Sequence, residues 1–259
     1  MHCPRRGACS IAIARLTGRR EVTVAPTRGA ELLAAAIAES ADGTDLPIRL
    51  LSACAGALSI TGAGLGLMSD NGPAGTIAAT DGPAVTLEDL QFTLGEGPCI
   101  EASRTGRPVL QADLAVTAPS RWPVFAAGAL TAGIRAVFAL PLRVGAIRLG
   151  VLDLYRDSPG PLTAGELREA LSYSDAATLL LLQLQGGGPA AGPTPDEVPM
   201  LDDRAEVHQA TGVVSVQADV GLAEALLLLR ARAYAQHRGI CDLARDVLEG
   251  IVDFGQEND

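Results

Sequence analysis

The chain is divided near its C-terminus by a segment that cannot form a regular helix or strand. Residues 186–199 read GGGPAAGPTPDEVP, and eight of these fourteen residues are glycine or proline. Proline lacks a backbone donor and glycine loses the most conformational freedom on ordering, so such a run is typical of a linker. The 259 residues leave room for a larger domain before this linker and a smaller one after it.

Residues 30–185 predict an α+β domain with an antiparallel sheet flanked by helices. Apolar runs at 63–69 and 75–80 flank the turn-forming sequence Asp70-Asn71-Gly72-Pro73 and predict a β-hairpin. A second hairpin is predicted from the β-branched runs 134–144 and 147–155, and a brief strand at 108–111. Helical spacing or helix-start residues predict helices at 31–39, 48–58, 98–103 and 122–130.

A longer helix is predicted from Thr163 to Gln185. Thr163 and Glu166 have the spacing of a capping box, which satisfies backbone donors at a helix start. Leu167, Leu171, Ser174, Thr178 and Leu181 trace a stripe along this helix. The stripe packs either on its own domain or on a second copy of the chain.

Residues 200–254 predict a small all-α unit of three helices, at about 201–216, 222–236 and 240–254. A unit of this size is marginal alone, and we expect a partner surface to stabilise it. At the other end, residues 1–29 combine arginines with the short apolar run ACSIAIA, without a convincing cleavage site. We expect a disordered tail or a misplaced start codon there, rather than a secretion signal.

Composition restricts the classes of function. Five scattered cysteines without a C-x-x-C pair fit a reducing cytoplasm and predict no zinc site. The long uncharged stretch of residues 50–69 contains glycine, serine and threonine and is a poor membrane span. A net charge of -10 argues against a broad electrostatic grip on nucleic acid or anionic lipid, so any nucleic-acid contact must be local.

The smaller unit resembles the ANTAR domain. The matching residues are Gln209 to Gly212, followed by Glu224-Ala225, Leu229-Arg230, Ala233, Asp242 to Ala244 and Val247. The resemblance implies a three-helix module that binds nascent RNA and prevents transcription termination. Gly212 should cost about 1 kcal/mol inside a helix. Close approach of another helix or of a ligand backbone would explain it.

Residues 50–185 resemble a GAF domain, a sensory or dimerising module. The matching stretches are LGEGPCIEA (94–102), RWPVFA (121–126) and GIRAVFALPLRVGAIRLGVLDLYR (133–156). The order of the two units is similar to that of actinobacterial GAF and ANTAR regulators. A GAF domain implies an unknown small-molecule ligand or other signal, and no Asn-Lys-x-Phe pattern of cyclic-nucleotide-binding GAF domains is present.

The candidate RNA-binding residues lie in the smaller unit, because arginine can pair with phosphate or stack on an unpaired base. They are Arg204, His208, Ala210, Thr211, Gly212, Arg230, Arg232 and Arg238, with Arg245 as a further candidate. Each arginine could equally form an ion pair, since residues 202–252 hold five arginines against eight acidic residues. Many ANTAR sequences carry a lysine where this chain has Thr211.

No catalytic or metal-binding residues are predicted. Cys99 is expected to be a small core residue, because no histidine or lysine lies near it in sequence. Glu96, Glu101, Asp113 and Asp153 show no acid-base spacing and are expected at caps, turns and the surface. Trp122 is expected to pack a helix onto the sheet.

The sequence therefore predicts a cytoplasmic, non-enzymatic regulator, expected to be a homodimer without a membrane or a resident cofactor. Its GAF-like domain would sense an unknown signal, and its ANTAR-like domain would bind transcript hairpins. The expected partners also include an upstream signalling protein. The alternative is a protein-interaction or dimerisation module that does not bind RNA.

Overall fold

The computed structural model describes residues 27–39, 45–69, 72–186, 204–236 and 238–255. The predicted tail at 1–29 and linker at 186–199 therefore lie almost wholly outside the described residues. The few described residues of these segments belong to helices: residues 28 and 29 begin the first helix, and residue 186 ends the seventh.

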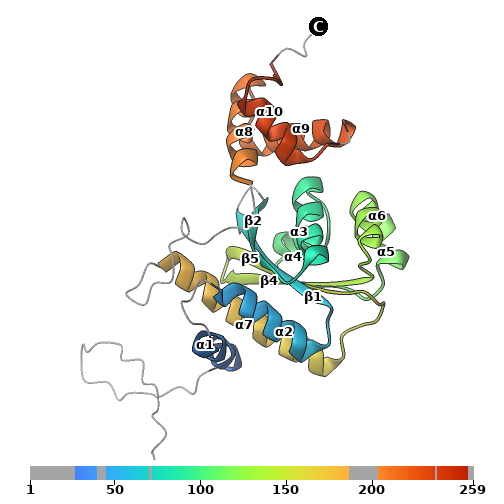
Figure 1. The fold of residues 1–259 in the computed structure, drawn as a ribbon, viewed down its shortest axis with the longest axis vertical. Coiled ribbons are helices and arrows are strands. Elements are labelled where there is room, and N and C mark those ends of the chain that lie inside the picture. Colours follow the sequence, from blue (N-terminus) through green and yellow to red (C-terminus); the bar gives the residue numbers. More distant parts are fainter. Residues whose placement is uncertain (1–26, 40–44, 70–71, 187–203, 237, 256–259) are drawn as a thin grey trace, which may run out of the picture.

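The described residues contain one five-stranded antiparallel sheet (Figure 1). The strand order is β2 (Gly72–Ala79), β1 (Gly62–Ser69), β5 (Ile147–Arg156), β4 (Ala136–Val144) and β3 (Val109–Gln111). Both predicted hairpins are confirmed, since β1 pairs with β2 and β4 pairs with β5. Each hairpin has a glycine with positive φ at its turn, Gly72 and Gly145.

Helices cover both faces of the sheet (Figure 1). One face carries α1 (Arg28–Glu39), α2 (Leu46–Leu58) and α7 (Ala164–Gly186). The other carries α3 (Gly82–Leu94), α4 (Pro98–Thr105), α5 (Leu114–Arg121) and α6 (Pro123–Thr131). Because strand side chains alternate, Leu152 and Leu154 face the first layer, whereas Val151, Asp153 and Tyr155 face the second.

The start of α7 confirms the predicted capping box. Glu166 accepts the Thr163 amide at 2.7 Å, and Thr163 Oγ1 accepts the Glu166 amide at 3.2 Å. The predicted apolar stripe is partly wrong, because Leu171 is exposed while Ala170, Tyr173 and Ala177 are buried. The buried face of α7 packs on α1, α2 and the sheet, so it serves its own domain.

Two helices of the second layer, α3 and α5, were not predicted. The α3 helix begins at Asp81, whose Oδ1 accepts the Ala84 amide at 2.8 Å, and has proline in its first turn. It ends at Gly95, which adopts φ 65° in the left-handed region that favours glycine. This helix contacts the C-terminal unit.

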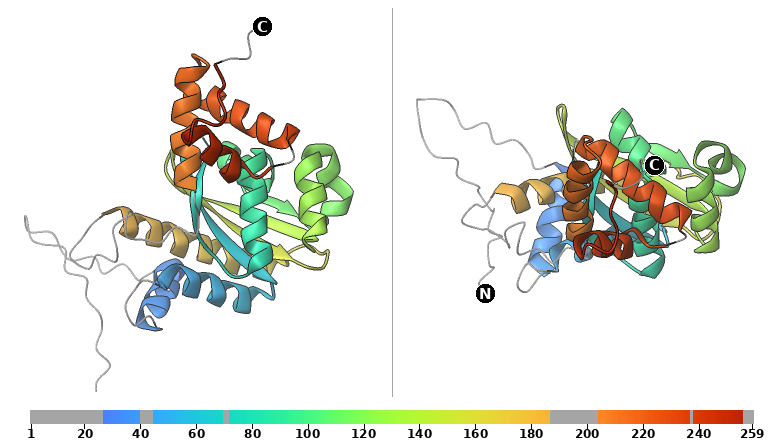
Figure 2. Two further views of the ribbon diagram at one scale, coloured as in Figure 1. Left: turned by 45° about the horizontal axis from the view of Figure 1, so that its top comes forward. Right: turned by 90° about the horizontal axis from the view of Figure 1, so that it is seen from above.

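The C-terminal unit consists of α8 (Arg204–Gln217), α9 (Leu222–Ala235) and α10 (Ile240–Leu248). Three helices were predicted, and the third is shorter than expected, since it ends before Gly250 at φ 73°. Buried apolar side chains of all three helices form one core, and Phe92 of α3 joins it. The unit thus lies against the end of α3 (Figure 2).

Within the described residues, no single helix is long and apolar enough to cross a membrane. The helix pair α8 and α9 would together be long and apolar enough, but the two helices meet at a bend of 106°.

Candidate functional site

Phe92 of α3 is the centre of the contact between the GAF-like domain and the C-terminal unit. Its ring is 2% exposed although it lies near the end of a helix. Three of the predicted RNA-binding residues, Arg204, His208 and Arg230, contact Phe92. Helices α8 and α9 thus direct these side chains toward one point on α3.

Arg204, the first residue of α8, stacks on the Phe92 ring. Its guanidinium carbon lies 4.2 Å from the ring centroid, and Nη2 lies 3.0 Å from Asp89 Oδ1. The Arg204 side chain is 2% exposed, whereas the Asp89 side chain is 56% exposed. The stacking therefore buries the cation, while its carboxylate partner stays in contact with water.

Arg230 approaches the same ring from α9. Its Nε donates to the Phe92 carbonyl oxygen at 3.0 Å, and its guanidinium carbon lies 5.7 Å from the ring centroid. Nη2 is buried and has no hydrogen-bond partner among the described residues. Burial, reinforced by the charge of Arg204, lowers the pKa of Arg230 to about 10. Arg230 is thus a desolvated cation without a carboxylate partner in the described part of the chain.

His208, one turn after Arg204 on α8, completes the contact. Its Nε2 lies 2.9 Å from the carbonyl oxygen of Ala74 in β2, and its ring meets Phe92 edge-on at 6.2 Å. We call Arg204, His208 and Arg230 the docked face. This face is covered by α3 and β2.

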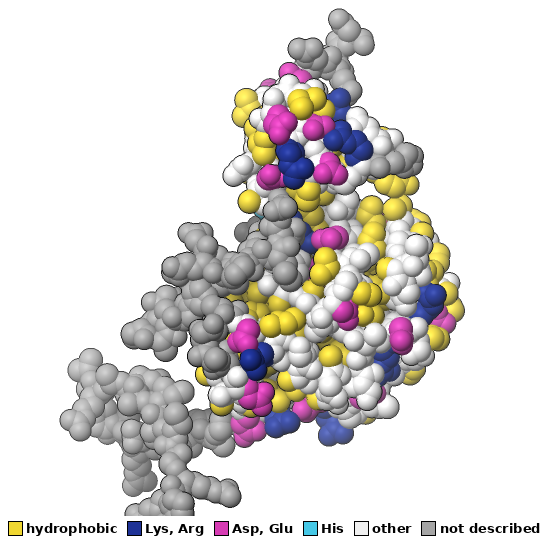
Figure 3. Space-filling view, viewed as in Figure 1, with side chains coloured by type: hydrophobic (Ala, Val, Ile, Leu, Met, Phe, Trp, Pro, Cys, Tyr) yellow, Lys and Arg dark blue, Asp and Glu magenta, His cyan; other side chains and the backbone are white. Residues whose placement is uncertain are grey.

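The remaining candidate arginines lie outside the docked face. Arg232 donates to the Asp253 carbonyl oxygen at 3.0 Å and stacks on Phe254. Arg238 pairs with Asp246 at 2.7 Å, and Arg245 pairs with Glu206 at 3.1 Å. On the visible surface of the unit, basic and acidic side chains alternate (Figure 3). These arginines pair with carboxylates or bind residues 253 and 254.

The residues of the ANTAR-like motif lie in the middle of α8. Ala210 is fully buried, and Thr211 is buried with its hydroxyl donating to the Val207 carbonyl at 2.7 Å. Neither side chain is available to a ligand in this arrangement. A Cβ added to Gly212 would meet no atom within 4 Å. Helix packing therefore does not explain this glycine.

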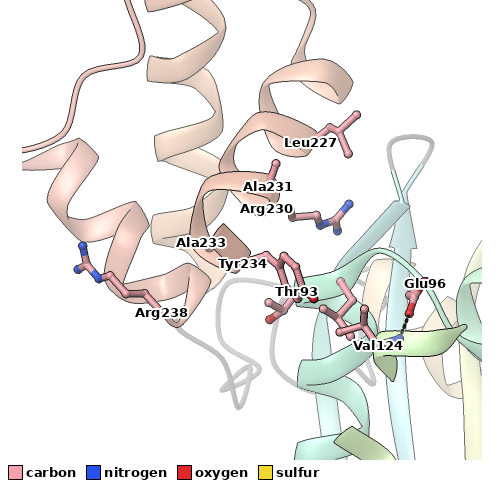
Figure 4. Close-up of a pocket in the computed structure, with 10 residues that line it drawn as sticks. Thr93, Glu96, Val124, Leu227, Arg230, Ala231, Ala233, Tyr234 and Arg238 are labelled. Carbon is pink, nitrogen blue, oxygen red and sulfur yellow. Dashed lines mark hydrogen bonds between the residues drawn. The ribbon is translucent and has the colours of Figure 1, made fainter. Parts of the chain in front are cut away.

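A cavity of about 320 Å³ lies between α9 and the GAF-like domain (Figure 4). Its walls include Thr93, Leu94 and Val124 on one side and Leu227, Arg230 and Tyr234 on the other. Tyr234 extends toward Thr93 and Val124, whereas Arg238 points away from the other labelled side chains (Figure 4). Glu96 also lines the cavity, and its Oε1 accepts the amides of Val124 and Phe125 at the start of α6.

A pair of carboxyl groups lies inside the GAF-like domain, below the docked face. Glu88 of α3 and Asp153 of β5 are both buried, and Gln91 Nε2 donates to Asp153 Oδ2 at 2.9 Å. Burial raises the pKa of Asp153 to about 7. Burial, together with the neighbouring Asp153, raises the pKa of Glu88 well above its usual value. The pair therefore retains protons that exposed carboxyl groups would lose.

The structure corrects one expectation about these residues and supports others. The prediction that Asp153 serves a cap, turn or surface role is wrong, because it is fully buried. Cys99 is a core residue as predicted, and burial raises the pKa of its thiol. Trp122 is buried against the second layer, as expected.

Glu96, Glu101 and Asp113 fill the expected cap and surface roles. Glu96 caps α6, Asp113 caps α5 and Glu101 pairs with Arg121. Among the described residues, no group of three or more histidine, cysteine or acidic side chains could hold a metal ion.

Sequence reasoning missed the α3 residues of the site: Glu88, Asp89, Gln91 and Phe92. The available signal was the helix start at Asp81-Gly82-Pro83 and the helix stop at Gly95. For Asp153, the signal was a carboxylate among the apolar residues of the strand predicted at 147–155.

The antiparallel sheet with a helical layer on each face defines an α+β domain, and comparison with known proteins identifies its family. The family model of the GAF domain matches residues 43–181, so the chain belongs to the GAF domain family. It thus contains a signal-sensing module. The match ends before α8, and the resemblance of residues 200–254 to the ANTAR domain stays a prediction.

Solved structures with similar folds include two bacterial domains. One is a domain assigned to a two-component sensor histidine kinase protein from Sinorhizobium meliloti 1021, with 22% identity and a TM-score of 0.45, covering 55% of this chain and 92% of that chain. Another is the GAF domain of an Acinetobacter phosphoenolpyruvate-protein phosphotransferase, with 11% identity and a TM-score of 0.45, covering 62% and 94%. No curated protein matches the chain.

Proposed function

We propose that this protein is a cytoplasmic, non-enzymatic transcriptional regulator whose GAF domain controls RNA binding by the C-terminal unit. The observation that carries the proposal is the docked face. Arg204, His208 and Arg230 come from two helices, converge on one side of the unit and are covered by the GAF domain. Release of the unit would expose all three together.

Arginine and histidine side chains gathered on one face suit an RNA loop. A guanidinium group can stack on an unpaired base, as both arginines stack on Phe92 here, and can pair with phosphate. Because residues 202–252 carry a net charge of -3, from five arginines and eight acidic residues, affinity must come from this local face. In the docked state the Phe92 ring thus takes the place that an unpaired RNA base would take against the two arginines.

The docked face provides a mechanism for control by a signal. In the docked state the cations that would contact RNA are engaged by α3 and β2. A signal that weakens the contact of α3 with α8 and α9 shifts the population toward the exposed state. The size of the shift is set by how much more tightly the signal binds the exposed state than the docked state. RNA binding then prevents termination of the transcript, as in the ANTAR domains that residues 200–254 resemble.

The proposal includes a homodimer, which presents two C-terminal units to paired RNA hairpins. Leu171 and Leu182 on α7 are exposed at 42% and 39% and lie on the helix that leads toward the C-terminal unit. The two units of a dimer would act on one transcript through effective concentration.

Crosslinking to cellular RNA tests the proposal. In Asp89→Lys, a lysine replaces the carboxylate beside Arg204, so repulsion weakens docking and recovery of RNA should rise several-fold. Adding Arg230→Ala or Gly212→Leu to Asp89→Lys should return recovery to background. Arg168→Gln, an equal charge change on α7, serves as the control for Arg230→Ala. Recovery at background from both wild type and Asp89→Lys would overturn RNA binding.

The second candidate function is a protein-interaction module without RNA binding. It is favoured by the ion pairs of Arg238 and Arg245 and by the docked face itself, which already contacts a protein surface. Salt separates the two candidates, because phosphate contacts require affinity to fall as the salt concentration rises. A partner captured by Asp89→Lys without this dependence would favour the second candidate.

A further inference from the structure

We propose that the cavity between α9 and the GAF domain is a binding site for a small organic carboxylate with an apolar or aromatic body. The site is formed by both units, lies outside the interior of the GAF domain and does not require that the C-terminal unit bind RNA.

The size and lining of the cavity suit a small molecule. Its volume of about 320 Å³ lies within the range of ligand pockets, roughly 300 to 1,000 Å³. Leu94, Val124 and Leu227 form apolar walls, and the Tyr234 ring reaches across from α9 (Figure 4). Such walls favour an apolar body of the size of a phenyl ring or a short alkyl chain.

Arg230 supplies the charge that selects a carboxylate. Arg230 lines the cavity, and among the described residues its hydrogen bond runs from Nε to the Phe92 carbonyl oxygen. Arg230 also has no carboxylate partner among the described residues, which is an unfavourable state for a largely desolvated cation. A ligand carboxylate at this edge of the cavity would supply the missing countercharge, since guanidinium and carboxylate groups pair well.

The other charged groups at the cavity do not replace Arg230. Glu96 lines the wall on the GAF domain, where its Oε1 is bound by the amides of Val124 and Phe125. Arg238 also lines the cavity, but its guanidinium group pairs with Asp246 at 2.7 Å. The ligand carboxylate is therefore positioned by Arg230, at the end of the cavity beside Phe92 and Gly95. Gly95 allows this position, because an added Cβ there would lie 2.8 Å from Arg230 Nη1.

Because the walls come from both units, the ligand stabilises the docked state. It contacts α9 on one side and the end of α3 and the start of α6 on the other. Binding to the docked state alone raises its population by mass action. The cavity is thus a place where a metabolite can hold the C-terminal unit against the GAF domain.

Calorimetric titration of the full chain tests the site. The probes are 3-phenylpropionate, hexanoate and indole-3-acetate, each compared with its neutral primary amide. At least one carboxylate should bind saturably with one site per chain, and its amide should bind at least about tenfold more weakly, since a charge-assisted pair is lost. Absence of saturable binding by all three carboxylates, or equal binding of acid and amide, would overturn the proposal.

Two variants and a matched control locate the binding. Arg230→Gln should reduce the affinity for the carboxylate to that for the amide, while Arg168→Gln, an equal charge change on the exposed side of α7, should leave it unchanged. Ala231→Phe, at an exposed helix position lining the cavity, should abolish binding of both compounds by filling the space. Binding that survives both Arg230→Gln and Ala231→Phe lies elsewhere and contradicts the proposed site.

Hydrogen exchange supplies a second readout. Saturating carboxylate should slow amide exchange in both walls, in α9 and in residues 91–96. Protection of one wall alone would contradict a ligand that bridges the two units.

Discussion

The carboxyl groups of Glu88 and Asp153 face each other in the core of the GAF domain, between α3 and the sheet. One oxygen of each group, Glu88 Oε1 and Asp153 Oδ1, is buried without a hydrogen-bond partner among the described residues. Gly64 and Gly66 of β1 leave the space that the Glu88 side chain occupies, since a Cβ at either position would collide with its carboxylate. Two buried carboxylates that interact directly cannot both ionise without a large cost, so the folded state holds a proton.

This pair predicts that stability falls as the pH rises from about 4 to about 7. The folded pKa of Asp153 is raised from 3.8 to about 7, so in this window the folded state binds a proton that the unfolded state has released. The free energy of unfolding then decreases with pH, by up to about 1.4 kcal/mol per pH unit for one proton. Below pH 4 Asp153 is protonated in both the folded and the unfolded state, and above pH 7 it is ionised in both, so the contribution of Asp153 becomes flat.

Asp153→Asn should reduce this slope and stabilise the protein at pH 8 by about 2 kcal/mol, because its amide can donate to Glu88 and needs no proton. Urea unfolding at several pH values from 4.5 to 8 measures the effect. Asp157→Asn, an exposed position after the same strand, should keep the wild-type slope. An unchanged slope in Asp153→Asn would show that the pair does not hold the proton.

Phe92→Ala should release the C-terminal unit from the GAF domain. The ring contacts both arginines of the docked face and belongs to the core of the three helices. Its removal should lower the free energy of local opening of α8 to α10 by about 3 kcal/mol. Hydrogen exchange measures this change element by element.

The strands β4 and β5 should keep their protection in Phe92→Ala, since the ring does not belong to their core. Val85→Ala, at a partly exposed position of the same helix, should change little. Equal protection of α8 to α10 in Phe92→Ala and wild type would contradict the role of Phe92 as the docking contact.

The hairpins and the C-terminal helices could be predicted because their patterns are local. Alternating apolar residues, a glycine at each turn and three helical segments specify these elements within a few residues of sequence. Helix α3 could not be found this way, because its buried positions include Glu88 and Gln91 as well as Leu87 and Phe92. Polar residues on the buried side erase the apolar stripe by which a helix is recognised.

The docked face was predictable only in part. The sequence identified Arg204, His208 and Arg230 as candidates by their chemistry. It could not show that they converge on Phe92, since the residues in contact are more than a hundred positions apart. Likewise, the partners of Arg238 and Arg245 depend on how α8 and α10 pack. Ion pairing between elements is set by tertiary structure, which composition does not reveal.

The buried cysteines should resist alkylation in the native protein. Burial raises the pKa of the Cys54 thiol to about 12 and that of Cys99 well above its usual value, so little thiolate forms at pH 8. Half-buried Cys241 should react first among these three. Iodoacetamide labelling with peptide mass spectrometry should show at least tenfold less modification at Cys54 and Cys99. Fast labelling of Cys99 would mean that its thiol is accessible and reactive in the native protein.

Gly212→Ala should stabilise the C-terminal unit by about 1 kcal/mol. Alanine is favoured over glycine by this amount within a helix, and the added methyl group meets no atom within 4 Å. The measurement is the free energy of opening of α8 by hydrogen exchange. Gly221→Ala, at the N-cap of α9 with φ -66°, is the control, because glycine is not disfavoured in a cap. A loss of stability in Gly212→Ala would mean that another surface approaches this glycine more closely in solution, as a second copy of the chain would. A gain in stability combined with a loss of RNA crosslinking in the Asp89→Lys background would mean that Gly212 is needed for RNA binding, although it lowers the stability of α8.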